Sequence, residues 1–149
     1  MSTTAQRGSP KLRLAAVFGL VVMATWTLVA KFLAPVLWAY AERAAGRPAE
    51  APVMWDFWWV AHLALAWMLW HRHRWARSFG LLVAGVEIAI VATKFAFYFQ
   101  APDLSFWRLL WFTHKVYVLA FFVAFAAWLF RPAARREFAN FPRGGGYGK

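Results

Sequence analysis

Four long apolar segments dominate this chain. They cover residues 14–30, 53–70, 79–100 and 109–130, and each is about as long as the roughly 20 apolar residues that cross the hydrocarbon core of a bilayer. Only 15% of the 149 residues are charged, compared with roughly 25% in a typical soluble domain. The sequence therefore predicts an all-α integral membrane protein with four transmembrane helices and no separate soluble domain.

The segment boundaries leave little chain outside the membrane. A basic tail at 1–13 precedes a membrane domain at 14–130, and a basic, glycine-rich tail follows at 131–149. The apolar run of the first segment is longer than the roughly 7–15 residues of a signal-peptide core, so we expect a retained helix there. With no cysteine, the chain has no disulfides and no thiolate metal sites. The expected spans are about 14–38, 53–71, 79–100 and 107–130.

The placement of basic residues predicts the orientation. Of the basic residues behind the net charge of +11, eleven lie in the two tails and in the loop at 71–77, and three lie in the other two loops. Cytoplasmic loops of membrane proteins carry such an excess of lysine and arginine. We therefore expect a multi-pass protein of the bacterial inner membrane with both termini in the cytoplasm. Its basic surface should contact anionic lipids, with no nucleic-acid partner.

Two octapeptides share one pattern. "WDFWWVAH" at 55–62 and "WRLLWFTH" at 107–114 each contain a tryptophan, three residues, a second tryptophan, two residues and a histidine. "VAKF" at 29–32 and "VATKF" at 91–95 precede them in the same order. This repetition predicts two tandem helical hairpins. Because two spans separate the copies, they would be parallel repeats related by an axis along the membrane normal.

Several charged side chains lie within or beside the expected spans. At such depth a charge costs at least about 2.5–3.5 kcal/mol, so these residues should face the interior of the bundle and find partners. Glu87 and Lys94 are seven residues apart and share a helical face, and the small residues Gly80 and Ala84 would let another helix approach that face closely. The alternative is that the lysines extend to the headgroups and Glu87 only ties helices together. The expected buried charge network consists of Glu87, Lys94, Lys31, Lys115 and Asp56.

The repeated histidines, His62 and His114, allow three interpretations. Each imidazole could simply donate a hydrogen bond to a neighbouring helix. Each could instead ligate the metal of a haem or a bacteriochlorophyll, with Trp59 and Trp111, one turn away, as flat walls beside the macrocycle. The third interpretation is a proton relay through His62, Glu87 and His114. The cofactor-binding residues predicted from this pattern are His62, His114, Trp59 and Trp111, with no metal site beyond a tetrapyrrole metal.

Two stretches resemble a known family. "WTLVAKFLAP" at 26–35 and "APVMWDF" at 51–57 are similar to motifs of the 2-vinyl bacteriochlorophyllide hydratase family, small polytopic proteins of bacteriochlorophyll synthesis. The resemblance implies that Trp55 and Asp56 correspond to the family's tryptophan and acid. It also implies a membrane enzyme that acts on a bacteriochlorophyll precursor.

Three functional classes follow from these features. The first is a tetrapyrrole-binding subunit of a membrane redox or photosynthetic system. The second is a hydratase-like membrane enzyme with a lipophilic substrate. The third is a structural or assembly subunit that binds other membrane subunits and has no ligand of its own.

Overall fold

The structure is a computed structural model that describes residues 10–50, 57–100 and 105–139. Every regular element in these ranges is a helix, and no strand occurs among them. Three helices are long and apolar enough to cross a membrane, namely Pro10–Ala44, Ala76–Gln100 and Arg108–Phe130. The all-helical fold is thus confirmed, and the length and composition of these helices suit a membrane protein.

The second expected span differs from the others. Its described helix, α3 (Trp58–Trp70), has 13 residues. A helix of that length is about 20 Å long, which is less than the roughly 30 Å of a hydrocarbon core. The span was expected to begin at residue 53, and residues 51–56 lie outside the described residues. By helix length, the structure therefore supports the first, third and fourth expected spans. The second expected span stays a prediction.

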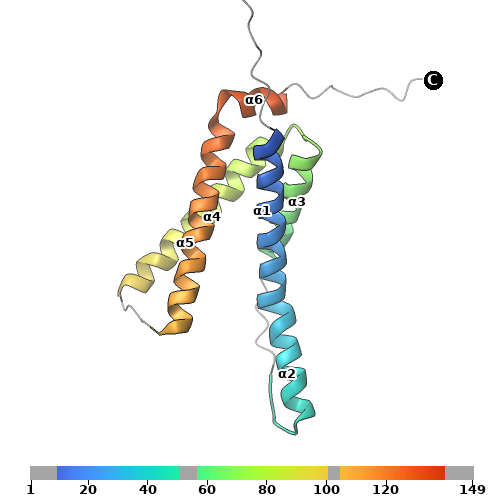
Figure 1. Cartoon of the computed structure of the whole chain (residues 1–149), viewed down its shortest axis with the longest axis vertical. Helices are drawn as coiled ribbons and strands as arrows, with labels where there is room; N and C mark the ends of the chain where they lie inside the picture. The colour runs from blue at the N-terminus through green and yellow to red at the C-terminus, as the bar shows by residue number, and fades with distance from the viewer. Residues whose placement is uncertain (1–9, 51–56, 101–104, 140–149) are drawn as a thin grey trace, which may run out of the picture. The chain divides into compact units, whose positions relative to one another are not determined.

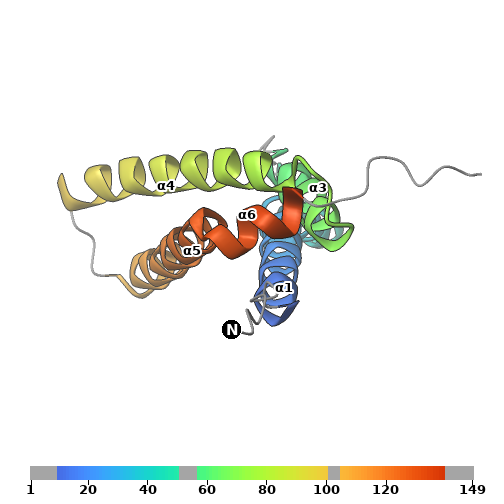
Figure 2. The same cartoon turned by 90° about the horizontal axis from the view of Figure 1, so that it is seen from above.

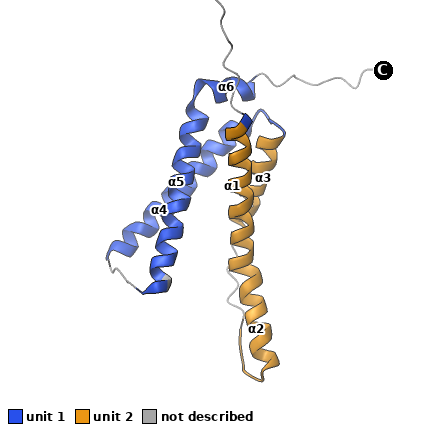
Figure 3. Cartoon of the chain, viewed as in Figure 1, with its two compact units in different colours: residues 1–10, 71–149 blue, residues 11–70 orange. Residues whose placement is uncertain are grey.

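The chain divides after Trp70 into two compact units, which Figure 3 colours separately. Unit 2 contains residues 11–70, and unit 1 contains residues 71–149 together with residues 1–10. This division falls in the loop that separates the two expected hairpins. The helices of the two units differ in length and in local geometry. The proposed sequence repeat therefore stays a prediction.

Unit 2 contains one long, continuous helical rod. Its middle part is π-helical, and Pro35 explains why. Proline has no N–H to donate to the carbonyl four residues earlier, here that of Lys31, and its ring clashes with that carbonyl in a regular α-helix. A π-helical turn moves the hydrogen bonding to a spacing of five, and the N–H of Ala34 donates to the carbonyl of Val29. The rod consists of α1 (Pro10–Leu28), η1 (Val29–Leu33) and α2 (Ala34–Ala44).

Helix α3 completes unit 2, and Figures 1 and 2 both show it next to α1. The buried residues of α1 are Ala16, Leu20 and Ala24, spaced by four so that they form one stripe. The buried residues of α3 also fall on one stripe, at His62, Leu65, Ala66 and Leu69. Both helices therefore present one buried face within an otherwise apolar surface, as a helix in a bilayer does.

The connection after α2 is fixed by short-range polar contacts. Gly46 has a φ of 74°, the left-handed conformation that glycine adopts after the end of a helix. Arg47 forms an ion pair with Glu42, and its Nη2 donates to Glu42 Oε1 at 2.9 Å. This hydrogen bond raises the pKa of the Arg47 guanidinium. Arg43 Nε also donates to the carbonyl of Ala49 at 2.8 Å, so the loop is held to the end of the helix.

Unit 1 is a hairpin of two long helices closed at one end by a short one. Helices α4 and α5 contact each other along the hairpin, and α6 contacts both of them (Figure 1). The buried stripe of α4 includes Gly80, Ala84, Glu87 and Val91, so the expected burial of the small-residue face is observed. The three helices are α4 (Ala76–Gln100), α5 (Phe106–Phe130) and α6 (Pro132–Ala139).

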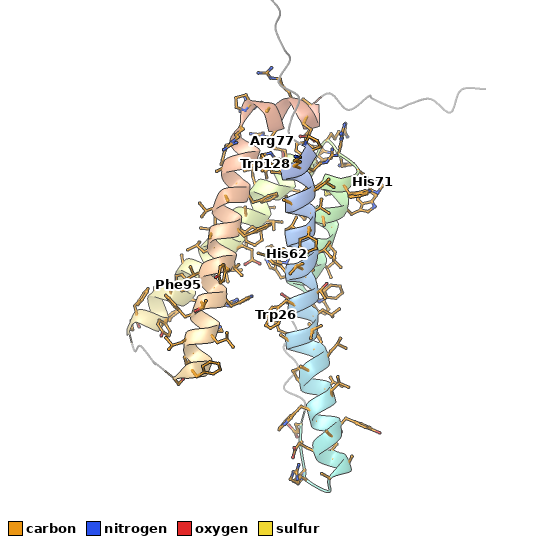
Figure 4. The ribbon with its side chains drawn as sticks, viewed as in Figure 1. Trp26, His62, His71, Arg77, Phe95 and Trp128 are labelled. Atoms are coloured by element: carbon orange, nitrogen blue, oxygen red, sulfur yellow. The ribbon has the colours of Figure 1, made fainter. Side chains whose placement is uncertain are left out.

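Aromatic side chains hold the helices of unit 1 together at two levels. Near the α4–α5 connection, the ring of Phe112 lies 4.9 Å from that of Phe95 and stacks on that of Tyr98 at 5.0 Å. Toward the other end, Phe122 is fully buried and Trp128 is 8% exposed. Figure 4 labels Phe95 at the first level and Trp128 at the second. Such ring pairs contribute about 0.5–1.5 kcal/mol each beyond the area that they bury.

Replacing Ala84 with leucine should destabilise the protein. Ala84 is 0% exposed, so three additional carbon atoms would have to displace packed neighbours, which typically costs about 1–3 kcal/mol. Thermal unfolding in detergent, followed by circular dichroism, would measure the loss. The matched control is Ala92→Leu, since Ala92 is exposed on the same helix. Equal melting temperatures for Ala84→Leu and the wild type would contradict the close packing of this face.

Candidate functional site

His62 is the most deeply buried titratable side chain of the described chain. It lies on α3 and is 3% exposed, among the apolar residues of the buried stripe. The ring of Trp58, one turn earlier, meets the imidazole edge to face, with ring centroids 6.1 Å apart and an interplanar angle of 72°. Figure 4 labels His62 on α3, within unit 2. The arrangement holds an imidazole in a dry, aromatic environment.

The second tryptophan of the motif adds a polar group to this region. Trp59 is half-buried, but its indole Nε1 is fully buried and has no hydrogen-bond partner among the described residues. Leaving a buried N–H donor without a partner costs about 1–3 kcal/mol. An acceptor oxygen on a bound molecule would recover this cost. His62 and Trp59 therefore offer a nitrogen ligand and a hydrogen-bond donor three residues apart on one helix.

The second motif is built differently. His114 lies on α5 and is only half-buried. Trp111 packs against α4, where its ring centroid lies 6.0 Å from that of Tyr98 at an interplanar angle of 32°. The Trp111 ring thus takes part in the contact between the two helices of unit 1. The octapeptides are alike in sequence, but their histidines differ in burial, and their tryptophans differ in role.

The charged residues of the expected network are spread over both units. Glu87 is 9% exposed on the buried stripe of α4. Lys94 shares its helical face by spacing but is exposed, because the buried part of that stripe ends at Val91. Lys115 is half-buried on α5, and Lys31 is half-buried in the π-helical turn of unit 2. The fifth residue of the expected charge network, Asp56, lies outside the described residues.

Trp58 was not singled out by the sequence pattern, which pointed to Trp59 as the neighbour of His62. The signal was present, because residues four apart on a helix lie on the same face. Trp58 is four residues before His62 and Trp59 three, so both were compatible with contact. The structure shows the ring contact for Trp58 and the buried, unsatisfied N–H for Trp59.

Within the described ranges, no group of three or more histidine, cysteine, aspartate and glutamate residues lies together so that it could hold a metal ion. Comparisons of the whole chain with protein-family models, curated proteins and solved structures give no match. The residues themselves therefore carry the functional interpretation, and His62 with its two tryptophans is the strongest site that they form.

Proposed function

We propose that this protein is a small membrane subunit that binds a tetrapyrrole, a haem or a bacteriochlorophyll-type pigment, in a membrane redox or photosynthetic system. The observation that carries the proposal is His62, an imidazole that is 3% exposed in an apolar helix with an aromatic ring against it. A neutral imidazole nitrogen is a common ligand of haem iron, and it suits the magnesium of a chlorophyll.

The residues around His62 fit such a group. The macrocycle of a tetrapyrrole supplies most of the ligands of its metal, so His62 could hold the group as the one ligand from the protein. The indoles of Trp58 and Trp59 offer apolar surface to a flat macrocycle. The unsatisfied Nε1 of Trp59 offers a donor to a carbonyl or carboxylate oxygen at the periphery of the ring. Burial of the site keeps water away from the metal.

His114 is the second candidate ligand. Each histidine would act as a separate ligand, because a chlorophyll-type pigment needs only one imidazole and the two histidines belong to different units. His62 is the better single ligand because it is the more buried and because Trp111, unlike Trp59, already packs on Tyr98. We therefore place the primary site at His62 with Trp59, and a secondary one at His114 with Trp111.

The hydratase-like alternative also involves binding of a tetrapyrrole. The similarity of residues 26–35 and 51–57 to the 2-vinyl bacteriochlorophyllide hydratase family would make the tetrapyrrole a substrate and not a resident cofactor. Trp55 and Asp56, the residues that carry this implied role, lie outside the described residues. Binding of a tetrapyrrole is common to both versions, and a measured turnover of a vinyl-substituted chlorin would favour the enzyme.

The protein would have a defined orientation in the membrane. We place the protein in a bacterial inner membrane with four spans and both termini in the cytoplasm, so that the basic loop at 71–77 and the helix after α5 meet the anionic inner leaflet. The three long apolar helices and the distribution of basic residues support this orientation. Contact with other membrane subunits would use the many apolar side chains exposed on α1 and α2.

Titration of the purified, detergent-solubilised protein with haem and with a zinc bacteriochlorin tests the binding. At least one of the two should bind saturably with a shifted absorption band, because axial ligation changes the electronic spectrum of the macrocycle. His71→Ala is the matched control, since His71 is an exposed histidine and should leave binding unchanged. If neither pigment behaves differently from its solution in protein-free micelles, the proposal is wrong.

A further inference from the structure

One end of unit 1 concentrates positive charge. It is the end where α4 begins and α5 finishes, and the two helices are tied there by Arg77, whose Nε donates to the carbonyl oxygen of Leu129 at 3.0 Å. In Figure 4, Arg77 and Trp128 are labelled close together at this end. The only acids in the described part of unit 1, Glu87 and Glu137, are buried and half-buried. We call this surface the basic end, and it consists of Arg74, Trp75, Arg77, Arg131, Arg135 and Arg136.

The chain changes direction sharply at Arg131. This residue has an extended backbone, with φ −62° and ψ 142°, and its N–H donates to the carbonyl of Trp128 at 3.0 Å. The N–H of Arg135 then donates to the carbonyl of Arg131 at 3.1 Å, so the first turn of α6 is anchored to the corner. Pro132 suits the first position of the new helix because its fixed φ is helical and no donor is lost there. The result is a defined corner and not a frayed helix end.

Helix α6 is docked by its apolar face. Ala134 and Phe138, four residues apart, are 1% and 2% exposed, and the ring of Phe138 meets that of Trp128 at 6.2 Å and 77°. Because this face is buried against the hairpin, Arg135 and Arg136 lie on the exposed side. Figures 1 and 2 show α6 turning away from the axis of α5. The short helix α6 therefore holds Arg135 and Arg136 in a fixed, exposed position.

The position of α6 at the end of α5 indicates which part of the bilayer it would contact. If α5 spans the membrane up to Phe130, a helix that turns off its axis directly afterwards lies at the level of the lipid headgroups. Trp75, at the start of α4, is 56% exposed and lies under the guanidinium of Arg74, with 5.4 Å from Cζ to the ring centroid. Tryptophan with arginine is typical of that level of a bilayer.

We infer that the basic end is a binding site for anionic phospholipid headgroups, in which the guanidinium groups of Arg135 and Arg136 contact the phosphate. Guanidinium groups bind phosphate oxygens through paired, charge-assisted hydrogen bonds. No exposed acid among the described residues of unit 1 competes for them. The inference rests on the proposed membrane insertion of α4 and α5, and it does not depend on tetrapyrrole binding.

Native mass spectrometry of the full-length protein in detergent, with phosphatidylglycerol and phosphatidylcholine of matched acyl chains, tests the site. The wild type should prefer phosphatidylglycerol. Each arginine near a membrane surface contributes about fivefold in affinity for anionic lipid, so Arg135→Gln with Arg136→Gln should reduce the preference by roughly 25-fold at low salt. The control, Arg43→Gln with Arg108→Gln, removes the same charge elsewhere and should retain the preference.

Three results would overturn the inference. They are an unchanged lipid preference in the α6 variant, an equal loss in the control variant, and full displacement of phosphatidylglycerol by an equal concentration of inorganic phosphate. The last would assign the site to a soluble anion. Far-UV circular dichroism should show the same helix content in all variants, because both arginine side chains are exposed. Pigment titration of the α6 variant should match the wild type, so failure of one site is distinguishable from failure of the other.

Discussion

Replacement of His62 with alanine is expected to remove the tetrapyrrole absorption band while the helices remain folded. Loss of a residue that only supports a metal ligand typically costs about 10–100-fold in affinity, so loss of the ligand itself should cost at least about 100-fold. The measurement is the visible absorption of variant and wild type at equal protein concentration, with far-UV circular dichroism as the check on folding. His71→Ala, in which an exposed histidine is removed, should keep the band.

Added imidazole separates ligation from packing. A cavity left by His62→Ala can admit free imidazole, which should restore part of the band if His62 is an axial ligand. A purely structural histidine would give no such recovery. Trp59→Phe should weaken binding while preserving the band position, because it removes the buried Nε1 donor and leaves the ligand in place. An undiminished band in His62→Ala would contradict the site.

Alkaline phosphatase fused after Gly46 should be active, and the same enzyme fused after Arg74 should be inactive. The enzyme is active only outside the cytoplasm, and α3 is the one described helix between the two fusion points. The expected difference is close to all or none. It tests the second expected span directly, because α3, the described helix of that span, has only 13 residues.

A fusion after Ala139, at the end of α6, is the companion measurement and should also be inactive. If α3 does not cross the membrane, the fusion after Arg74 will be as active as the one after Gly46. That result would contradict the four-span orientation and would leave the three long helices as the only spans.

The apolar pattern of the sequence predicted the position of the helices better than their ends. The expected spans 79–100 and 107–130 agree closely with α4 and α5. The first expected span, 14–38, lies inside a helical rod that runs from Pro10 to Ala44. Apolar composition marks the part of a helix that lies in hydrocarbon, whereas backbone hydrogen bonding continues into polar residues at both ends. The ends were therefore not predictable from hydropathy.

Two local features needed the structure. The π-helical turn had its signal in Pro35, yet proline can equally kink or end a helix, so the sequence did not decide among these outcomes. Helix α6 lies within the segment expected to be a basic tail, and at eight residues it is too short for a clear helical period. Its docking becomes apparent only from the burial of Ala134 and Phe138.

The burial of His62 was predictable from the sequence, but the packing around the two histidines was not. The repeated pattern correctly singled out a histidine that is buried, His62, yet it treated His114 as equivalent. The tryptophans differ as well, since Trp111 contacts Tyr98 of α4, whereas the Nε1 of Trp59 is buried without a hydrogen-bond partner among the described residues. Which aromatic rings contact each other between two helices of a hairpin cannot be predicted directly from a single sequence.

The visible absorption spectrum of the wild-type protein, purified in mild detergent from its native membrane, tests the central claim most directly. We predict a tetrapyrrole band that remains with the protein through size-exclusion chromatography, at about one pigment per chain or per pair of chains. A colourless, folded protein from a membrane that contains haem and bacteriochlorophyll would contradict the claim.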